Sequence, residues 1–158
     1  MFSFRIHPSL PLYTIKPVFD IDIVGELTVY RAGSVARWQT LDECEVIDSP
    51  PKGERWLKTE DLNFDGFEDL LLLAWWGATG NQSWCVWLFD PPSGKFRYVR
   101  DFSLGAHVLN PKDKSITVSA NGGGAGGIAD RVTVRFIGAR PVMVKQAKRP
   151  AETSVPPR

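Results

Sequence analysis

The sequence predicts an all-β protein with a single antiparallel β domain, built as a sandwich or as part of a propeller. No segment longer than ten residues keeps helical spacing without Gly, Pro or a β-branched run. Short apolar or alternating runs recur at regular spacing and are separated by turn residues. The 158 residues, 43% of them hydrophobic and six of them Trp, suffice for one domain with its own core.

The domain boundaries follow from composition. We expect residues 1–17 to form an N-terminal arm, residues 18–147 the β domain, and residues 148–158 a disordered tail, since that tail is charged and rich in Pro. Residues 19–23 alternate apolar and acidic side chains, which predicts a strand with one buried and one solvated face. The turn at residues 32–34 lies between two runs of strand character and predicts a hairpin.

Two later runs, residues 70–76 and 84–89, are apolar without alternation. This pattern is typical of central strands that are covered on both faces. Residues 90–95 contain Pro-Pro-Ser-Gly and predict a second hairpin. A glycine-rich loop, "NGGGAGG", follows the strand predicted at residues 115–120. Two final strands, at residues 131–137 and 141–147, complete the domain.

The charge balance gives no general argument for nucleic acid or a membrane as partner, because the net charge is only +1. The charge is unevenly distributed, however. Residues 41–69 hold ten acids against three bases, and seven bases against one acid follow from Arg131 onward. Two solvated faces with a basic tail would explain this asymmetry, and so would an acidic face that binds a metal or a basic partner.

The two cysteines, Cys44 and Cys85, leave two interpretations open. They could form one disulfide across a loop of about forty residues, or Cys85 could be an inert buried thiol within its apolar strand. The N-terminus lacks the apolar run of a signal peptide, and residues 70–76 are too short to span a membrane. Taken alone, these features predict a soluble, cytoplasmic protein, and a protein whose export signal has been removed would have the same features.

The segment "DLNFDGFED", residues 61–69, has the spacing of a calcium-binding loop. Asp61, Asn63 and Asp65 occupy its first, third and fifth positions, where their oxygens can converge on one cation. Gly66 permits a sharp turn at the sixth position. Phe67 offers a backbone carbonyl at the seventh, and Asp69 closes the site at the ninth. The alternative is a metal-free turn capped by its own Asp and Asn side chains.

This loop differs from a helical calcium hand. Its twelfth position is Leu72 rather than the bidentate Glu of such hands, and its flanks have strand character. We therefore expect a Ca²⁺ loop within a β fold. No position is evidently left for a substrate, so the metal would have a structural role.

Evidence for catalysis is thin. His7 and His107 have no nucleophilic Ser or Cys nearby in the sequence, and metalloprotease and serine-hydrolase motifs are absent. The glycine-rich loop lacks the Lys-Ser/Thr ending of a phosphate loop. We therefore expect that the protein is not an enzyme. The three Trp between Trp75 and Trp84 could cover the core, or they could anchor a partner protein or a sugar.

The order of the motifs resembles a bacterial family. The segments "DLNFDGFEDLLLL", "GATGNQSWCVWLFDPPSGKF" and "NPKDKSITVSANGGGAGG" are similar to those of calcium-binding β proteins that act as immunity proteins and lysozyme inhibitors. Such proteins protect a cell against peptidoglycan-cleaving effectors of type IV or type VI secretion systems, and they are typically periplasmic or lipoproteins. The resemblance therefore implies a periplasmic protein whose export signal has been removed, with a cytoplasmic protein as the alternative. The calcium loop also resembles one FG-GAP repeat of the integrin-type propellers. The resemblance covers about residues 55 to 125 and implies that Asp61, Asn63, Asp65 and Asp69 bind Ca²⁺.

The resemblance also implies that inter-strand loops plug the active-site groove of a lysozyme-like effector. The loops that match are "GATGNQSW" and "NGGGAGG". Trp84 stands where family members often carry an aromatic residue, and Ile128 stands at a second such position. The partner-binding residues expected on these grounds are Trp76, Thr79, Asn81, Trp84, Asn121, Gly123, Gly124 and Ile128.

The sequence therefore predicts an immunity protein that binds and sterically inhibits a peptidoglycan-hydrolysing effector. The alternative, from a different functional class, is a calcium-dependent adhesion or carbohydrate-binding β module. Both hypotheses require surface loops on a rigid β scaffold.

Overall fold

The computed structural model of the chain describes residues 1–20, 23–46, 55–77, 80–120 and 130–148. Within these residues it contains twelve strands and no helix, which confirms the all-β prediction. The strands are β1 (Phe2–Arg5), β2 (Leu12–Asp20), β3 (Ile23–Arg31), β4 (Arg37–Leu41), β5 (Leu57–Glu60), β6 (Asp69–Trp76), β7 (Gln82–Asp90), β8 (Lys95–Tyr98), β9 (Ala106–Asn110), β10 (Ser115–Ala120), β11 (Asp130–Ile137) and β12 (Arg140–Lys148).

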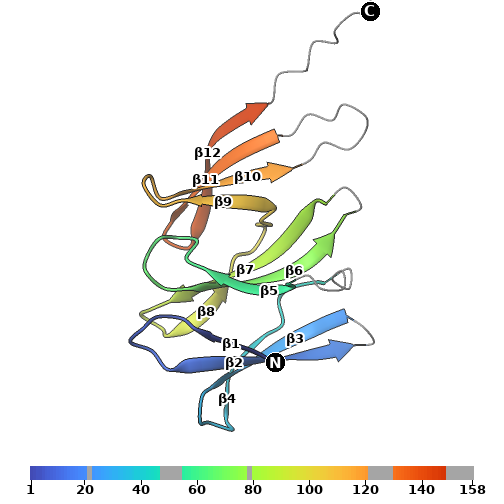
Figure 1. The fold of residues 1–158 in the computed structure, drawn as a ribbon, viewed down its shortest axis with the longest axis vertical. Coiled ribbons are helices and arrows are strands. Elements are labelled where there is room, and N and C mark those ends of the chain that lie inside the picture. Colours follow the sequence, from blue (N-terminus) through green and yellow to red (C-terminus); the bar gives the residue numbers. More distant parts are fainter. Residues whose placement is uncertain (21–22, 47–54, 78–79, 121–129, 149–158) are drawn as a thin grey trace, which may run out of the picture.

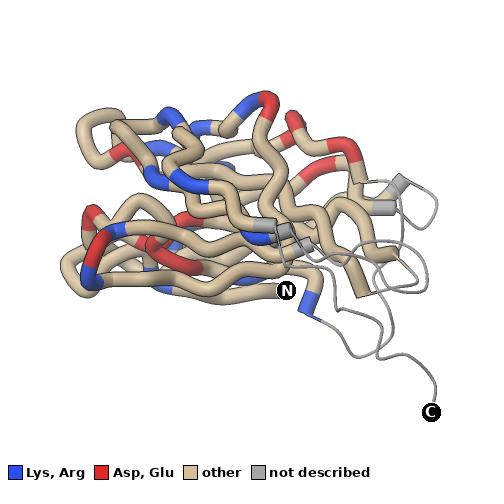
Figure 2. Tube along the Cα trace, turned by 90° about the horizontal axis from the view of Figure 1, so that it is seen from above, with Lys and Arg blue, Asp and Glu red and all other residues tan. Residues whose placement is uncertain are grey.

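These strands form three four-stranded antiparallel sheets, each made of consecutive strands. We call them sheet A (β1–β4), sheet B (β5–β8) and sheet C (β9–β12). Figure 1 shows them stacked, with sheet A at the bottom, sheet B in the middle and sheet C at the top. Figure 2, a view from above, shows charged residues spread over several separate segments of the tube. The molecule is therefore a three-layered β stack.

Sheet B is buried on both faces. Leu70 and Leu72 of β6 pack in the core between sheets A and B, whereas Leu71 and Leu73 pack between sheets B and C. Strand β7 divides its side chains in the same way, because successive residues of a strand point to opposite faces. The prediction that both runs are central strands covered on each side is confirmed.

Both expected hairpins are present. β3 pairs with β4 around the turn at residues 32–34, and β7 pairs with β8 around the Pro-Pro-Ser-Gly turn. The two final strands, β11 and β12, also pair with each other. Gly94 and Gly138 have φ values of 61° and 60°, which suit glycine in such tight turns.

Two expectations about the N-terminal part were wrong. Residues 1–17 are no separate arm, because β1 and most of β2 lie within them and form half of sheet A. Residues 19–23 are no continuous strand, since β2 ends at Asp20, β3 begins at Ile23, and these two residues are paired with each other in the antiparallel ladder. Phe19 is accordingly exposed rather than buried. Residues 149–158 of the expected tail lie outside the described residues.

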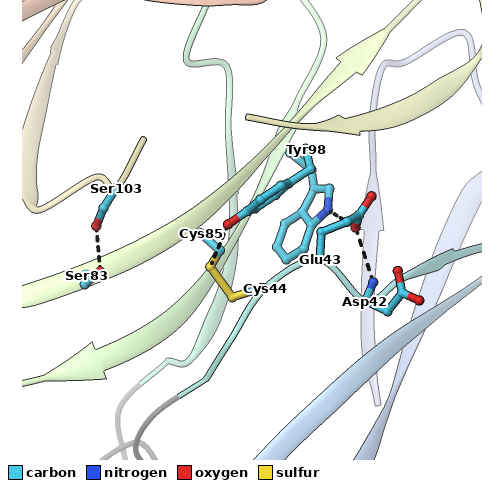
Figure 3. Close-up of a disulfide and its surroundings, with 8 residues drawn as sticks. Asp42, Glu43, Cys44, Ser83, Cys85, Tyr98 and Ser103 are labelled. Atoms are coloured by element: carbon cyan, nitrogen blue, oxygen red, sulfur yellow. Dashed lines mark hydrogen bonds between the residues drawn. A yellow bond between two sulfur atoms is a disulfide. The ribbon is translucent and has the colours of Figure 1, made fainter. Parts of the chain in front are cut away.

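A disulfide joins sheet A's exit segment to sheet B. Cys44, which follows β4, is bonded to Cys85 of β7, with 5.9 Å between the Cα atoms and 41 residues between them in sequence (Figure 3). Both cysteines are buried. The first of the two interpretations of the cysteines is therefore correct.

A polar cluster joins sheets B and C. His107 of β9 contacts the Glu60 carboxylate of β5 through Nε2 at 2.6 Å, and its Nδ1 lies 2.8 Å from the Gly105 carbonyl oxygen. Lys58 also pairs with Glu60, at 2.8 Å. Burial raises the pKa of Glu60, but the hydrogen bonds and charges of His107 and Lys58 outweigh it and hold the pKa below the ordinary value of 4.5.

Removal of the disulfide should destabilise the fold. The double substitution Cys44→Ser and Cys85→Ser releases a loop of 41 residues, and we expect a loss of about 3 to 4 kcal/mol in the free energy of unfolding. Urea unfolding measures this loss. A reductant should lower the stability of the wild type and leave the double variant unchanged; equal stability of the two proteins without reductant would contradict the prediction.

Glu60 should make stability depend on pH. Its folded-state pKa is lowered, so the ionised group stabilises the fold above its unfolded-state pKa, and this contribution is lost as the pH falls through the folded-state pKa. Glu60→Gln should therefore lower Tm more at about pH 7 than at about pH 3. Thermal unfolding of both proteins at the two pH values measures this, with the exposed Asp42→Asn as control. An equal loss at both pH values would disprove the role of the charge.

Candidate functional site

The Asp-rich loop, residues 61–68, joins β5 to β6 at one end of sheet B. Leu62 is fully buried in the core between sheets B and C. On the other side, the Phe67 ring stacks on Phe89 with 5.4 Å between centroids and belongs to the core between sheets A and B. Phe64 and Gly66 adopt positive φ values of 59° and 91°, which produces the sharp turn expected of Gly66. The loop is thus fixed between both cores.

The polar side chains of the loop turn toward its own backbone. Asp61 accepts hydrogen bonds from the amides of Asp65, at 3.1 Å, and Gly66, at 2.9 Å. Asn63 Oδ1 accepts from the Asp65 amide at 3.1 Å, and Asp65 accepts from the Phe67 amide at 2.9 Å. The oxygens at the first, third and fifth positions therefore face one small region, as a cation-binding loop requires.

Asp69 has a different environment from the rest of the loop. It is fully buried, and its two carboxylate oxygens accept hydrogen bonds from the amides of Leu62 and Phe89, both at 2.9 Å. Burial raises its pKa to about 8, and the nearby carboxylates of Asp65 and Asp61 add to this shift, while the two amides oppose it. In the described part of the chain, no Lys, Arg or His forms an ion pair with Asp69.

The residues expected to bind the metal thus fall into two groups with different roles. Asp61, Asn63 and Asp65 lie together at the turn, and Asp69 connects the start of the loop to β7. Among the described residues, no three Asp, Glu, His or Cys side chains lie close enough to form a metal cluster. The oxygen donors of the loop are of the hard type preferred by Ca²⁺, and a cation bound there would favour the ionised form of Asp69, which burial disfavours.

The two predicted partner-binding loops start from two sheets, one between β6 and β7 at the opposite end of sheet B and the other between β10 and β11 of sheet C. Gly105 lies between them: a Cβ on this residue would be 3.5 Å from the Ser119 carbonyl oxygen of β10 and 3.6 Å from the Gln82 carbonyl oxygen of β7. Trp84 and Leu104 exchange two backbone hydrogen bonds beside it, at 2.8 and 3.1 Å. The ends of the β6–β7 and β10–β11 hairpins therefore lie side by side.

Of the expected partner-binding residues, two are at this end and described. Trp76 is partly buried against the core between sheets B and C, and Asn81 bonds through its carbonyl oxygen to the Gly77 amide at 2.8 Å. The others, apart from Trp84, lie outside the described residues: Thr79, Asn121, Gly123, Gly124 and Ile128.

The prediction that Trp84 contacts a partner was wrong. Its side chain is only 4% exposed and packs between sheets B and C. Its Nε1 donates to Gln82 Oε1 at 2.9 Å, and the Lys58 ammonium lies 4.6 Å from the ring centroid. Trp84 therefore covers the core, which was one of the two interpretations that the sequence left open.

Sequence reasoning missed a second feature at this end. A pocket of about 400 Å³ opens beside the disulfide, between the segment after β4, the ends of β6 and β7, and the segment after β8. Glu43, Trp75 and Asp101 are among its lining residues. They are distant in sequence and are brought together by the sheet stacking and the Cys44–Cys85 bond. The acids on both sides of Cys44 and the aromatic residues at Trp75 and Trp84 were the sequence signals for it.

The chain was compared with known proteins. No protein family model and no curated protein sequence matches it. A solved structure described as that of a Xanthomonas type IV secretion system related protein is similar, with a TM-score of 0.54 and 16% sequence identity. The match covers 87% of this chain and 77% of the other. At this identity, the similarity establishes a shared fold. In the described part of the chain, no helix is long and apolar enough to cross a membrane.

Asp69 should be essential for stability whether or not a cation binds. Asp69→Ala leaves the buried amides of Leu62 and Phe89 without acceptors, so we expect a loss of about 1 to 3 kcal/mol for each amide. Urea unfolding in excess chelator measures this loss without any contribution from a cation. Asp65→Ala is the matched control and should lose less, because its hydrogen bonds are exposed. Equal losses in the two variants would contradict this role.

Proposed function

We propose that this chain is an immunity protein that binds a peptidoglycan-hydrolysing effector and inhibits it sterically. The observation that carries the proposal is the side-by-side arrangement of the β6–β7 and β10–β11 hairpin ends. These hairpins carry the two segments that resemble the inhibitory loops of lysozyme-inhibitor proteins. Loops that start from adjacent strand ends can enter one groove together.

The scaffold behind these loops suits a binding site. β7 is buried on both faces, and β10 contributes the fully buried Ile116 to the core between sheets B and C. A loop held by rigid strands loses less conformational entropy on binding than a free segment does, which favours affinity. The fold shared with a type IV secretion system related protein is consistent with this proposal.

We further propose that the Asp-rich loop binds one Ca²⁺ through Asp61, Asn63, Asp65 and the backbone carbonyl of Phe67. The cation would supply positive charge beside carboxylates that otherwise repel one another. Asp69 would balance that charge from its buried position while it holds the Leu62 and Phe89 amides. Since the loop lies at the far end of β6 from the paired hairpins, the role of the metal is structural.

The disulfide supports a periplasmic location. Disulfides form and persist in oxidising compartments and are rare in the cytosol. The Cys44–Cys85 bond closes a long loop around the connection between sheets A and B, so the mature fold depends on an oxidising environment. A periplasmic inhibitor would also meet its target where peptidoglycan is exposed.

A pulldown from lysate of the source organism tests the function. We expect the immobilised protein in Ca²⁺ to capture a hydrolase that clears peptidoglycan suspensions, and added protein should suppress that clearing. Asn81→Arg, at the paired hairpin ends, should reduce capture and inhibition. Ser93→Arg, in the β7–β8 turn at the opposite end of β7, is the matched control.

Two outcomes would overturn the inhibitor proposal. In the first, a hydrolase is captured, but its activity is unchanged by saturating protein. In the second, no protein is captured and the chain is retained on glycan beads in a chelator-sensitive way. The second outcome would favour the adhesion or carbohydrate-binding alternative.

Calcium should stabilise the fold through Asp65. We expect Ca²⁺ at some hundreds-fold above Kd to stabilise the wild type by about 3 to 4 kcal/mol, and to have little effect on Asp65→Ala. Thermal unfolding in Ca²⁺ and in chelator measures both values, with Asp113→Asn as a control at an exposed acid outside the loop. A full calcium response in Asp65→Ala would rule out this ligand.

A further inference from the structure

The pocket beside the disulfide combines aromatic walls with negative charge. Its aromatic walls include Trp75, Tyr98 and Phe102, and Cys85 of the disulfide is also among its lining residues. Figure 3 shows Tyr98 beside this disulfide. The Trp75 side chain is 37% exposed, although it is among the largest apolar groups of the protein. Its ring lies over Gly77, where an added Cβ would come within 2.5 Å of it, so the ring is held by the end of the β6–β7 hairpin.

Three carboxylates line the same pocket, those of Glu43, Glu45 and Asp101, and none of the described residues that line it is Lys or Arg. The Glu43 carboxylate is fixed in place, because its Oε2 accepts hydrogen bonds from the Trp87 indole at 2.9 Å and from the Asp42 amide at 3.2 Å. The Trp87 side chain is fully buried. The Glu43 carboxylate is thus held in place by a side chain of the core.

The carboxylates of the pocket also affect Tyr98, one of its aromatic wall residues. Burial raises the pKa of Tyr98, and the charges of Glu43 and Asp101 raise it further, whereas Arg100 opposes the shift. Arg100 is exposed and does not line the pocket. A cation that entered would find both carboxylates and π faces, the two groups that attract cations most strongly in proteins.

We propose that this pocket receives an arginine side chain of the partner protein. Arginine fits better than lysine, because its planar guanidinium stacks on aromatic rings and forms bidentate hydrogen bonds with carboxylates. The pocket lies at the same end of sheet B as the paired hairpin ends, so an arginine beside the groove of the bound enzyme would reach it. This inference rests on the proposed function for the identity of the partner, but the site itself does not.

A peptide experiment tests the site directly. The probe is a short, otherwise uncharged peptide with two arginines, and its matched control carries citrulline, which keeps the shape and loses the charge. Titration is followed by the NMR shift of the Trp75 indole N–H. We expect the arginine peptide to move this signal and the citrulline peptide to leave it unchanged.

Charge removal tests the residues. The double variant Glu45→Gln and Asp101→Asn should bind the arginine peptide about fivefold to tenfold more weakly. The control double variant Asp90→Asn and Asp113→Asn removes two negative charges, as many as the pocket variant, from positions outside the pocket. It should bind the arginine peptide like the wild type. Equal affinity for the two peptides, or equal affinity of the pocket variant and the wild type, would overturn the proposal. Thermal unfolding checks that both variants are folded.

Capture and inhibition of the hydrolase by the pocket variant distinguish a failure of this inference from a failure of the proposed function. If the wild type captures and inhibits the enzyme and the pocket variant does so equally well, the arginine pocket is wrong and the inhibitor function stands. If the arginine peptide binds at Trp75 but no hydrolase is inhibited, the pocket stands and the inhibitor function is wrong.

Discussion

The burial of sheet B on both faces is the constraint on which the whole structure depends. A sheet whose strands are apolar on each side is stable only when other layers cover both sides. Sheets A and C supply these layers, and each contributes one apolar face to a separate core. Neither outer sheet needs two apolar faces, so their outward sides can carry charged residues. The three-layered stack is thus the solution that the β6 and β7 sequences require.

Polar groups join the layers where the cores end. The Glu60–His107 pair connects sheets B and C, and the Cys44–Cys85 bond connects sheet A's exit segment to sheet B. Apolar packing has little directional preference, whereas these two contacts require particular partners. They therefore fix how the layers are positioned relative to one another. Within sheet B, Asp69 ties the Asp-rich loop to β7, at the end away from the paired hairpins.

Sequence reasoning predicted the features that depend on local chemistry. Uniformly apolar runs identified the central strands, and turn residues identified two hairpins. Sequence reasoning failed at residues 19–23, where the alternating pattern continues although β2 ends at Asp20 and β3 begins at Ile23, and at β9, whose five residues are too short for a periodic signal. Trp84 shares its face with Val86 and Leu88, so strict alternation along β7 would have placed it in the core. The bonds of Asp69 and the pocket depend on long-range packing, which spacing in the sequence does not encode.

The assembly of each sheet from consecutive strands has a consequence for the folding reaction. Every pairing within a sheet joins neighbours in the chain, so each meander can form early and at small loop-closure cost. The β6–β7 hairpin is then the segment most prone to aggregation during folding. Until both outer layers have docked, it exposes two apolar faces that favour association with other chains. The rate at which sheets A and C dock therefore governs how much newly made chain reaches the native state before it aggregates.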